Sequence, residues 1–202
     1  MILKIDHIAY STISPDQEIN ILLKKGYKLL FSEKLPNPEI KSNLLSSYKD
    51  THKITLLETP YSFNIEFVDH GYTSKNPGYI TLRDNDVVEI NTTNISSSTE
   101  LFRGLGFQYK DKNEVFFQSL FNSKKFNIKF NQVESSNNKL DDQGFNCIAF
   151  ISNSVEKERH LLQSLGLHLT NTSFLKVNNK TLKIFFAQRD KNEILEIIEI
   201  SK

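Results

Sequence analysis

The order of hydrophobic and polar residues repeats three times along the chain. Each repeat opens on an apolar-rich run of the length of a strand, and a helical stripe of apolar residues follows it. The opening runs are Lys4–Thr12, Val87–Thr93 and Phe145–Ser152. Because internal repeats decide the architecture of a chain, this pattern predicts several copies of one small unit.

The three helical stripes have similar ends. Each follows a serine that we expect to cap the first turn, and each stops at a glycine, the residue that most easily takes the left-handed conformation at helix C-termini. The expected caps are Ser14, Ser97 and Ser154, and the glycines are Gly26, Gly106 and Gly166. A helix is therefore predicted between each serine and its glycine.

Alternating or wholly apolar runs after each helix predict further strands, joined as antiparallel neighbours. The first set is Lys28–Lys34, His52–Thr59 and Phe63–His70; the middle set is Glu114–Leu120 and Phe126–Val133; the third set is Ser173–Val177, Thr181–Gln188 and Glu193–Ile200. The middle set lacks a clear second strand. We therefore expect modules at residues 1–72 and 143–202 and a shortened one at residues 86–134.

The first and third modules correspond residue by residue. The spacing from His7 to Gly26 equals that from Cys147 to Gly166, and the strand containing Glu66 resembles the one containing Glu196. The stretch at residues 35–50 contains Pro36 and Pro38. It predicts either a lid or a long loop leading into a strand.

Composition narrows the function classes. The chain has 202 residues with 25 Lys and Arg and 24 Asp and Glu, a formal net charge of +1, which argues against a dedicated nucleic-acid-binding protein. Cys147 is the only cysteine, so no internal disulfide can form. No run approaches the roughly 18 apolar residues that cross a bilayer, and the first residues do not resemble a signal peptide. We expect a cytoplasmic protein with neither nucleic acid nor membrane as partner.

Three short motifs carry a resemblance to a known family. They are Ile5-Asp6-His7-Ile8-Ala9-Tyr10, the helix end Lys25-Gly26-Tyr27, and Asn64-Ile65-Glu66-Phe67-Val68. In these motifs the chain resembles the vicinal oxygen chelate superfamily, also called glyoxalase-like. The resemblance implies an α+β fold of repeated βαβββ modules, with mixed, mainly antiparallel, cupped sheets. It also implies that two modules surround a divalent metal.

The resemblance implies ligands at defined positions: a first-strand residue, usually histidine, and a last-strand residue, usually glutamate, from each module. His7 and Glu66 match in the first module, and Glu196 matches in the third, where Cys147 stands at the histidine position. Lys129 takes the glutamate position of the middle module, and a protonated lysine cannot ligate a metal.

The implied metal site is therefore His7, Glu66 and Glu196, with Cys147 as a fourth candidate, and the first and third modules must face each other. Such a donor set suits Zn, Ni, Mn, Co or Fe. Glu66 or Glu196 could also serve as the catalytic base. A thiolate ligand at Cys147 would favour zinc.

Each of these residues also has a structural interpretation. His7 could be a hydrogen-bonded core histidine, Cys147 an ordinary buried thiol, and either glutamate a solvent-facing residue of a one-sided sheet. His70 shares a face with Glu66 by the period of two and could line the cleft, but a surface position at the strand end is the preferred interpretation, and we expect His52 to be exposed.

The leading interpretation is a metal-dependent lyase or isomerase of the glyoxalase and epimerase kind, acting on a small molecule with vicinal oxygens. One alternative is a metal-free protein of the same fold that binds a small ligand between its many Phe and Tyr side chains. Another is a catalytically inactive structural protein. An unpaired middle module leaves an open sheet edge, which would permit a homodimer.

Overall fold

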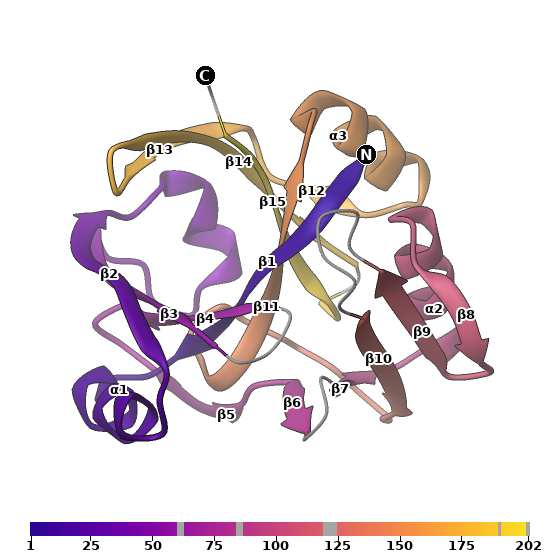
Figure 1. Cartoon of the computed structure of the whole chain (residues 1–202). Coiled ribbons are helices and arrows are strands. Elements are labelled where there is room, and N and C mark those ends of the chain that lie inside the picture. The colour runs from indigo at the N-terminus through magenta and orange to yellow at the C-terminus, as the bar shows by residue number, and fades with distance from the viewer. Residues whose placement is uncertain (60–62, 84–86, 119–124, 190, 201–202) are drawn as a thin grey trace.

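The computed structural model describes residues 1–59, 63–83, 87–118, 125–189 and 191–200. Three copies of a βαβββ unit follow one another along the chain (Figure 1). The first consists of β1 (Ile2–Ser11), α1 (Pro15–Lys24), β2 (Lys28–Pro36), β3 (Thr51–Glu58) and β4 (Asn64–Asp69). The middle one consists of β7 (Val87–Thr92), α2 (Ile95–Gly104), β8 (Gln108–Asp111), β9 (Glu114–Gln118) and β10 (Lys125–Gln132). The third consists of β11 (Asp142–Ser152), α3 (Val155–Ser164), β13 (Ser173–Val177), β14 (Lys180–Gln188) and β15 (Ile194–Ile200), with the short β12 (His168–Leu169) beside β14.

All three units have the same strand order. The first strand pairs in parallel with the last, and the remaining strands follow as antiparallel neighbours, which gives β1-β4-β3-β2, β7-β10-β9-β8 and β11-β15-β14-β13. The α+β fold with mixed, mainly antiparallel sheets that the sequence predicts is therefore confirmed. The sequence predicted no clear second strand in the middle unit, but β8 occupies that place. Its four residues are all exposed and show no hydrophobic alternation. The end of the expected strand Glu114–Leu120 lies outside the described residues.

The first and third units join through their opening strands. β1 and β11 run antiparallel, and Ile8 pairs with Ile148, its own counterpart in the repeat. The two units are thus related by an approximate twofold axis at this pair, and their outer strands curve toward each other around a shared cup (Figure 1). The first and third units therefore lie side by side, as the implied metal site requires.

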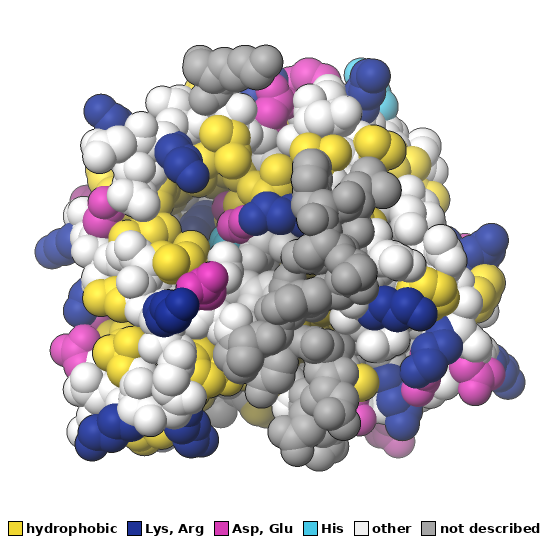
Figure 2. Space-filling model, viewed as in Figure 1, with side chains coloured by type: hydrophobic (Ala, Val, Ile, Leu, Met, Phe, Trp, Pro, Cys, Tyr) yellow, Lys and Arg dark blue, Asp and Glu magenta, His cyan; other side chains and the backbone are white. Residues whose placement is uncertain are grey.

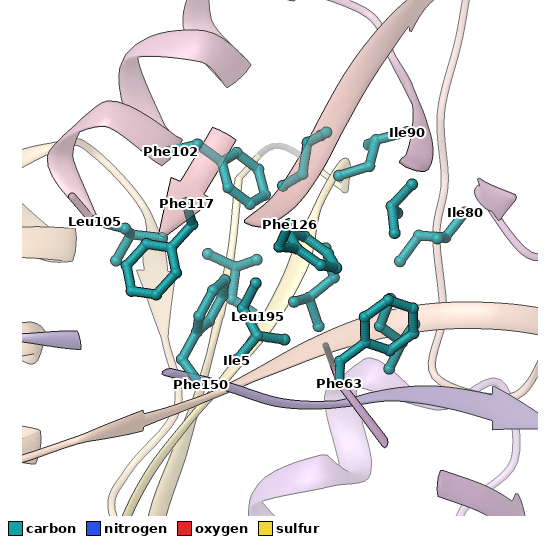
Figure 3. Close-up of a cluster of buried hydrophobic side chains, with 14 of the residues drawn as sticks. Ile5, Phe63, Ile80, Ile90, Phe102, Leu105, Phe117, Phe126, Phe150 and Leu195 are labelled. Atoms are coloured by element: carbon teal, nitrogen blue, oxygen red, sulfur yellow. The ribbon is translucent and has the colours of Figure 1, made fainter. Parts of the chain in front are cut away.

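The middle unit packs on the opposite face of this joint sheet. β5 (Ser74–Pro77) and β6 (Ile80–Arg83) lead into it, and β6 pairs with both β7 and β11. Its aromatic residues continue the main core, as Phe126 meets Phe63 edge-on at 5.2 Å between ring centroids and Phe102 lies 6.4 Å from Phe150 (Figure 3). The middle unit therefore supports the cup from behind. Its strand β8 ends the sheet, and the homodimer expected from such an edge stays a prediction.

The helix ends agree only partly with the sequence signals. Gly26, Gly106 and Gly166 all have positive φ, as expected. Ser154 caps α3 by accepting a hydrogen bond from the backbone N–H of Lys157. Ser14 stands at the N-cap position of α1, but its side chain makes no capping bond. The assignment for α2 was wrong, because Asn94 rather than Ser97 caps that helix. In the part of the chain that the structure describes, no helix has the length and apolarity needed to span a bilayer.

A second, smaller apolar core lies inside the cup. Residues 37–50, here called the insert, connect β2 with β3 and contain the 3-10 helix η1 (Glu39–Leu44). The insert places Leu44 and Leu45 against Ile184 and Phe186 of β14. The insert is therefore a long connection leading into β3, as one of the two interpretations of the sequence has it, and it is packed against the third unit at one end of the cup.

Candidate active site

A cavity of about 380 Å³ opens between the strands of the first and third units. Its walls are largely apolar and include Leu30, Ile54, Leu56, Ile151, Leu182 and Ile198. Its charged lining includes Asp6, His7, Lys41, Glu66 and Glu196. Figure 2 shows this face hollowed, with basic, acidic and histidine side chains visible in the recess between hydrophobic ones. The cup thus combines a charged floor with apolar walls.

His7 reaches the floor because β1 is irregular at this point. Between Ile5 and His7 the strand advances two residues while β11 advances one, so Asp6 is the extra residue of a β-bulge. The Asp6 carboxylate lies 3.2 Å from Nδ1 of His7 and 2.9 Å from Nζ of Lys4. Burial would raise the pKa of Asp6, but its hydrogen bond to His7 and the nearby positive charges hold that pKa well below the ordinary value.

Glu66 and Glu196 occupy equivalent places on either side of the twofold axis. Glu66 on β4 pairs with Ala9, and Glu196 on β15 pairs with Ala149, so both carboxylates point to the same side as His7. Oε1 of Glu66 lies 3.6 Å from Nε2 of His7, and Oε2 of Glu196 lies 3.7 Å from it. The structure therefore brings together the three side chains that the sequence pattern selects.

The three groups influence one another's protonation. Burial disfavours the charged form of His7, yet the carboxylates of Glu66 and its neighbours outweigh burial and raise the His7 pKa well above its ordinary value. Burial raises the pKa of Glu66, and the charge of Glu196 adds to this, while His7 opposes it. Such mutual perturbation in a cleft is typical of functional sites.

Cys147 lies one step further into the cup than the other three. It pairs with Ala9 and is buried, beside a void of about 10 Å³ that Glu66 and Glu196 also line. Burial, together with the charge of Glu196, raises the pKa of the thiol well above its ordinary value. Only a thiolate ligates a metal, and this environment favours the protonated thiol. The role of Cys147 as a fourth ligand stays a prediction.

The donor set can be tested against a divalent metal. Nε2 of His7 is buried and has no hydrogen-bond partner among the described residues, while Asp6 holds the other ring nitrogen, the arrangement found around metal-bound histidines. Ligand atoms at about 2.1 Å from one ion lie about 3–4 Å apart, and the two carboxylate distances from Nε2 fall in that interval. As they stand, no three or more His, Cys, Asp or Glu side chains among the described residues have the arrangement of a metal site. The donor chemistry of His7, Glu66 and Glu196 fits a divalent metal, and binding would require the carboxylates to turn from the imidazole toward the ion.

The expectation for two further histidines was wrong. His52 is 1% exposed and His70 is 2% exposed, and their ring centroids lie 5.9 Å apart beneath the insert. Burial, with the positive charge of Lys41 in second place, lowers the pKa of His52 to about 2 and that of His70 to about 3. The sequence showed only that both histidines lie at strand ends. The insert has no regular pattern of hydrophobic residues, so nothing in the sequence indicated that it would cover them.

Sequence reasoning missed four charged residues that line the cavity, Lys4, Asp6, Lys41 and Lys180, of which Lys41 is the most buried. Lys41 belongs to η1, is 5% exposed, and lines both the cavity and the small void beside Cys147. Its charge acts on Glu66, Cys147 and both buried histidines. No sequence signal distinguished this lysine from the many surface lysines, because the fold of the insert alone turns it inward.

No protein-family model matches the chain, and no curated protein sequence matches it. Solved structures do. Methylmalonyl-CoA epimerase from Mycobacterium tuberculosis aligns over 100% of this chain and 91% of its own, with 13% identity and a TM-score of 0.50. A substituted Streptomyces coelicolor methylmalonyl-CoA epimerase, in complex with 2-nitronate-propionyl-CoA, aligns over 100% of both chains with 10% identity and a TM-score of 0.50. The chain therefore shares the fold of these epimerases, in agreement with the repeated βαβββ units that the sequence resemblance implies.

Proposed function

From this fold and the geometry of the cup, we propose that the protein is a metal-dependent isomerase or lyase acting on a small substrate with vicinal oxygens. The observation that carries the proposal is the buried Nε2 of His7, which makes no hydrogen bond among the described residues and lies 3.6 Å from the Glu66 carboxylate and 3.7 Å from the Glu196 carboxylate. The two carboxylates favour a positive charge at this place, which a proton on His7 supplies in the metal-free protein and a divalent ion would supply in its stead.

His7, Glu66 and Glu196 would hold the ion. A divalent metal in such a site acts as a Lewis acid that stabilises negative charge developing on the substrate oxygens. Asp6 would orient the His7 ring and keep the proton on Nδ1, which leaves the Nε2 lone pair available. The β-bulge at Asp6 is what makes this contact between adjacent residues of one strand.

The proton transfer would fall to a carboxylate. Glu66 has a pKa raised by burial, so it can accept a proton from the carbon beside a carbonyl group and return it. Glu196 occupies the equivalent position across the axis, on the opposite side of a substrate centred there. One carboxylate would carry the proton while the other, together with His7, would keep holding the ion. The apolar walls would exclude water from the reacting atoms.

The test is metal content, measured after purification without chelator or affinity tag and after loading with Zn, Ni, Mn, Co or Fe(II). The wild type is compared with His7→Ala and Glu66→Gln, and with the exposed His160→Ala as control. We expect near-stoichiometric metal in the wild type and the control and a large loss in both site variants. The loaded protein is then incubated with 2-oxo and 2-hydroxy acids in heavy water, where deuterium should enter beside the carbonyl group. A wild type that retains none of the metals refutes the proposal.

A second candidate function is the binding of a small anionic ligand without metal. The buried ammonium of Lys41 beside an apolar cavity favours it, because such a group can bind an anion without help from a metal. Tight ligand binding by metal-free protein, with no deuterium exchange under any metal, would support this candidate over the enzyme.

A further inference from the structure

The insert is a feature of the first unit alone. In the other two units the equivalent connections are tight turns, at residues 112–113 between β8 and β9 and at residues 178–179 between β13 and β14. The insert, by contrast, spans residues 37–50 and enters the cup. Because the other two units form the same fold without such an insert, the shared fold does not require it. We therefore assign it a role in the cup.

The insert is fixed by the segment just before β11. The buried Asp141 carboxylate accepts hydrogen bonds from the backbone N–H groups of Ser46 at 2.9 Å and Ser47 at 3.1 Å. The backbone N–H of Leu140 donates to the carbonyl of Leu44 at 2.8 Å. Charge-assisted bonds to a buried carboxylate are strong. The position of Lys41 is therefore set by the first and third units together.

Lys41 is a buried cation without an acidic partner. Among the described residues its Nζ makes no hydrogen bond and no ion pair within 4.0 Å, although Glu66 and Glu196 line the same cavity. Its Nζ lies 5.2 Å from the centroid of the Phe186 ring. Placing a lysine in a buried position without an acidic partner is unfavourable, so stability does not explain this lysine. An anionic ligand in the cavity would complete its interactions.

We propose that Lys41 binds the carboxylate of the substrate, and that the substrate is a compact organic acid with vicinal oxygens and an apolar side chain. The inference rests on the proposed function, because it places the ligand in the same cup. The charged floor would hold the carboxylate and the vicinal oxygens, and the apolar walls would hold the side chain. A cavity of about 380 Å³ lies near the small end of ligand pockets, which span roughly 300–1,000 Å³, so it accepts a molecule of this size.

The experiment compares an acid with its neutral counterpart. Calorimetric titration of metal-loaded protein uses 4-methyl-2-oxopentanoate, the corresponding amide, and inorganic phosphate as a second anion. The variants are Lys41→Met and, should that variant fold poorly, Lys41→Gln. Lys49→Met is the matched control, because Lys49 lies in the same insert but its Nζ donates to the backbone carbonyl of Gly71 at the surface.

We expect the wild type and Lys49→Met to bind the acid at least about tenfold more tightly than the amide, and Lys41→Met and Lys41→Gln to lose this preference while still binding the amide. A wild type that binds the acid no better than the amide overturns the inference. So does a Lys41 variant that keeps the preference, or phosphate binding that exceeds acid binding.

Metal content of the same samples separates the two proposals. Metal retained with no preference for the acid removes the inference and leaves the proposed function standing. Acid preference that depends on Lys41 in protein that binds no metal keeps the inference and removes the metal-dependent enzyme. Lys41→Met should itself hold metal at least as well as the wild type, since it removes a positive charge from the cup.

Discussion

Replacing the buried His52 by leucine should stabilise the protein, and more so at acidic pH. Both ring nitrogens of His52 lack hydrogen-bond partners among the described residues, so the substitution removes two unsatisfied polar atoms and sacrifices no bond. An unsatisfied buried polar group costs about 1–3 kcal/mol. Leucine fills a similar volume beside the apolar residues of the cup. We therefore expect a gain of about 1–2 kcal/mol in the free energy of unfolding at pH 7.5.

The pH dependence follows from the depressed pKa values. The folded pKa of His52 is about 2 and that of His70 about 3, whereas unfolded histidine titrates near pH 6.5. The unfolded chain therefore binds more protons below pH 6.5, so stability is complete above that pH and falls as the pH drops through it. At pH 4.5 each histidine costs about 2.7 kcal/mol, and both together about 5 kcal/mol. That is comparable with the whole stability of many domains.

Urea unfolding at pH 7.5 and pH 4.5 measures both effects. The carboxylates titrate in the same interval, so the wild type is compared with His52→Leu at each pH, and the difference isolates His52. The gain from the substitution should grow by about 2.7 kcal/mol between the two values. The exposed His160→Gln should stay within about 0.5 kcal/mol of the wild type at both. A His52→Leu protein that is less stable at pH 7.5, with an unchanged loss on acidification, would refute the reasoning.

Two further substitutions test the framework of the cup. Gly78→Ala should lower the free energy of unfolding by about 2–3 kcal/mol, because a Cβ there would lie 2.3 Å from the backbone oxygen of Phe145. Urea unfolding measures this loss, and a variant as stable as the wild type would contradict the close approach of the two backbone segments. Asp141→Ala removes the acceptor of the Ser46 and Ser47 N–H groups, and we expect the insert to exchange its amide hydrogens at least about tenfold faster while β1 stays protected, which hydrogen exchange followed by mass spectrometry would show.

Much of the cup could be predicted because the three units repeat one order of elements, so a residue in one unit can be compared with the equivalent residue in another. The likeness of the two strands that contain Glu66 and Glu196 placed these residues at equivalent positions, and the structure brings both carboxylates within 3.7 Å of the His7 imidazole. Strand order follows from the same correspondence, since one unit determines the pairing of all three. What repeats along a chain is visible in its sequence.

Features that depend on contacts distant in sequence could not be predicted. Strand β8 has four exposed residues and so shows no alternation, although pairing with β9 defines it. His52 sits at a strand end, where sequence reasoning expects exposure, but the insert covers it. Lys41 faces inward because Asp141, about a hundred residues later, holds the backbone that carries it. Hydrophobic periodicity contains no information on any of these contacts.

The departures from symmetry in the cup lie together. Across the twofold axis Glu66 is matched by Glu196, but His7 is matched by Cys147, and the void beside Cys147 is also lined by Lys41. An imidazole is larger than a thiol, so a histidine at that position would need space that is now shared with the lysine side chain. A thiol at position 147 and an inward-facing Lys41 are therefore structurally compatible with each other. A thiol in place of an imidazole, with a lysine beside it, gives this part of the cup less capacity for a cation and more capacity for an anion, so in the proposed function this pair of residues favours an acid as the bound ligand.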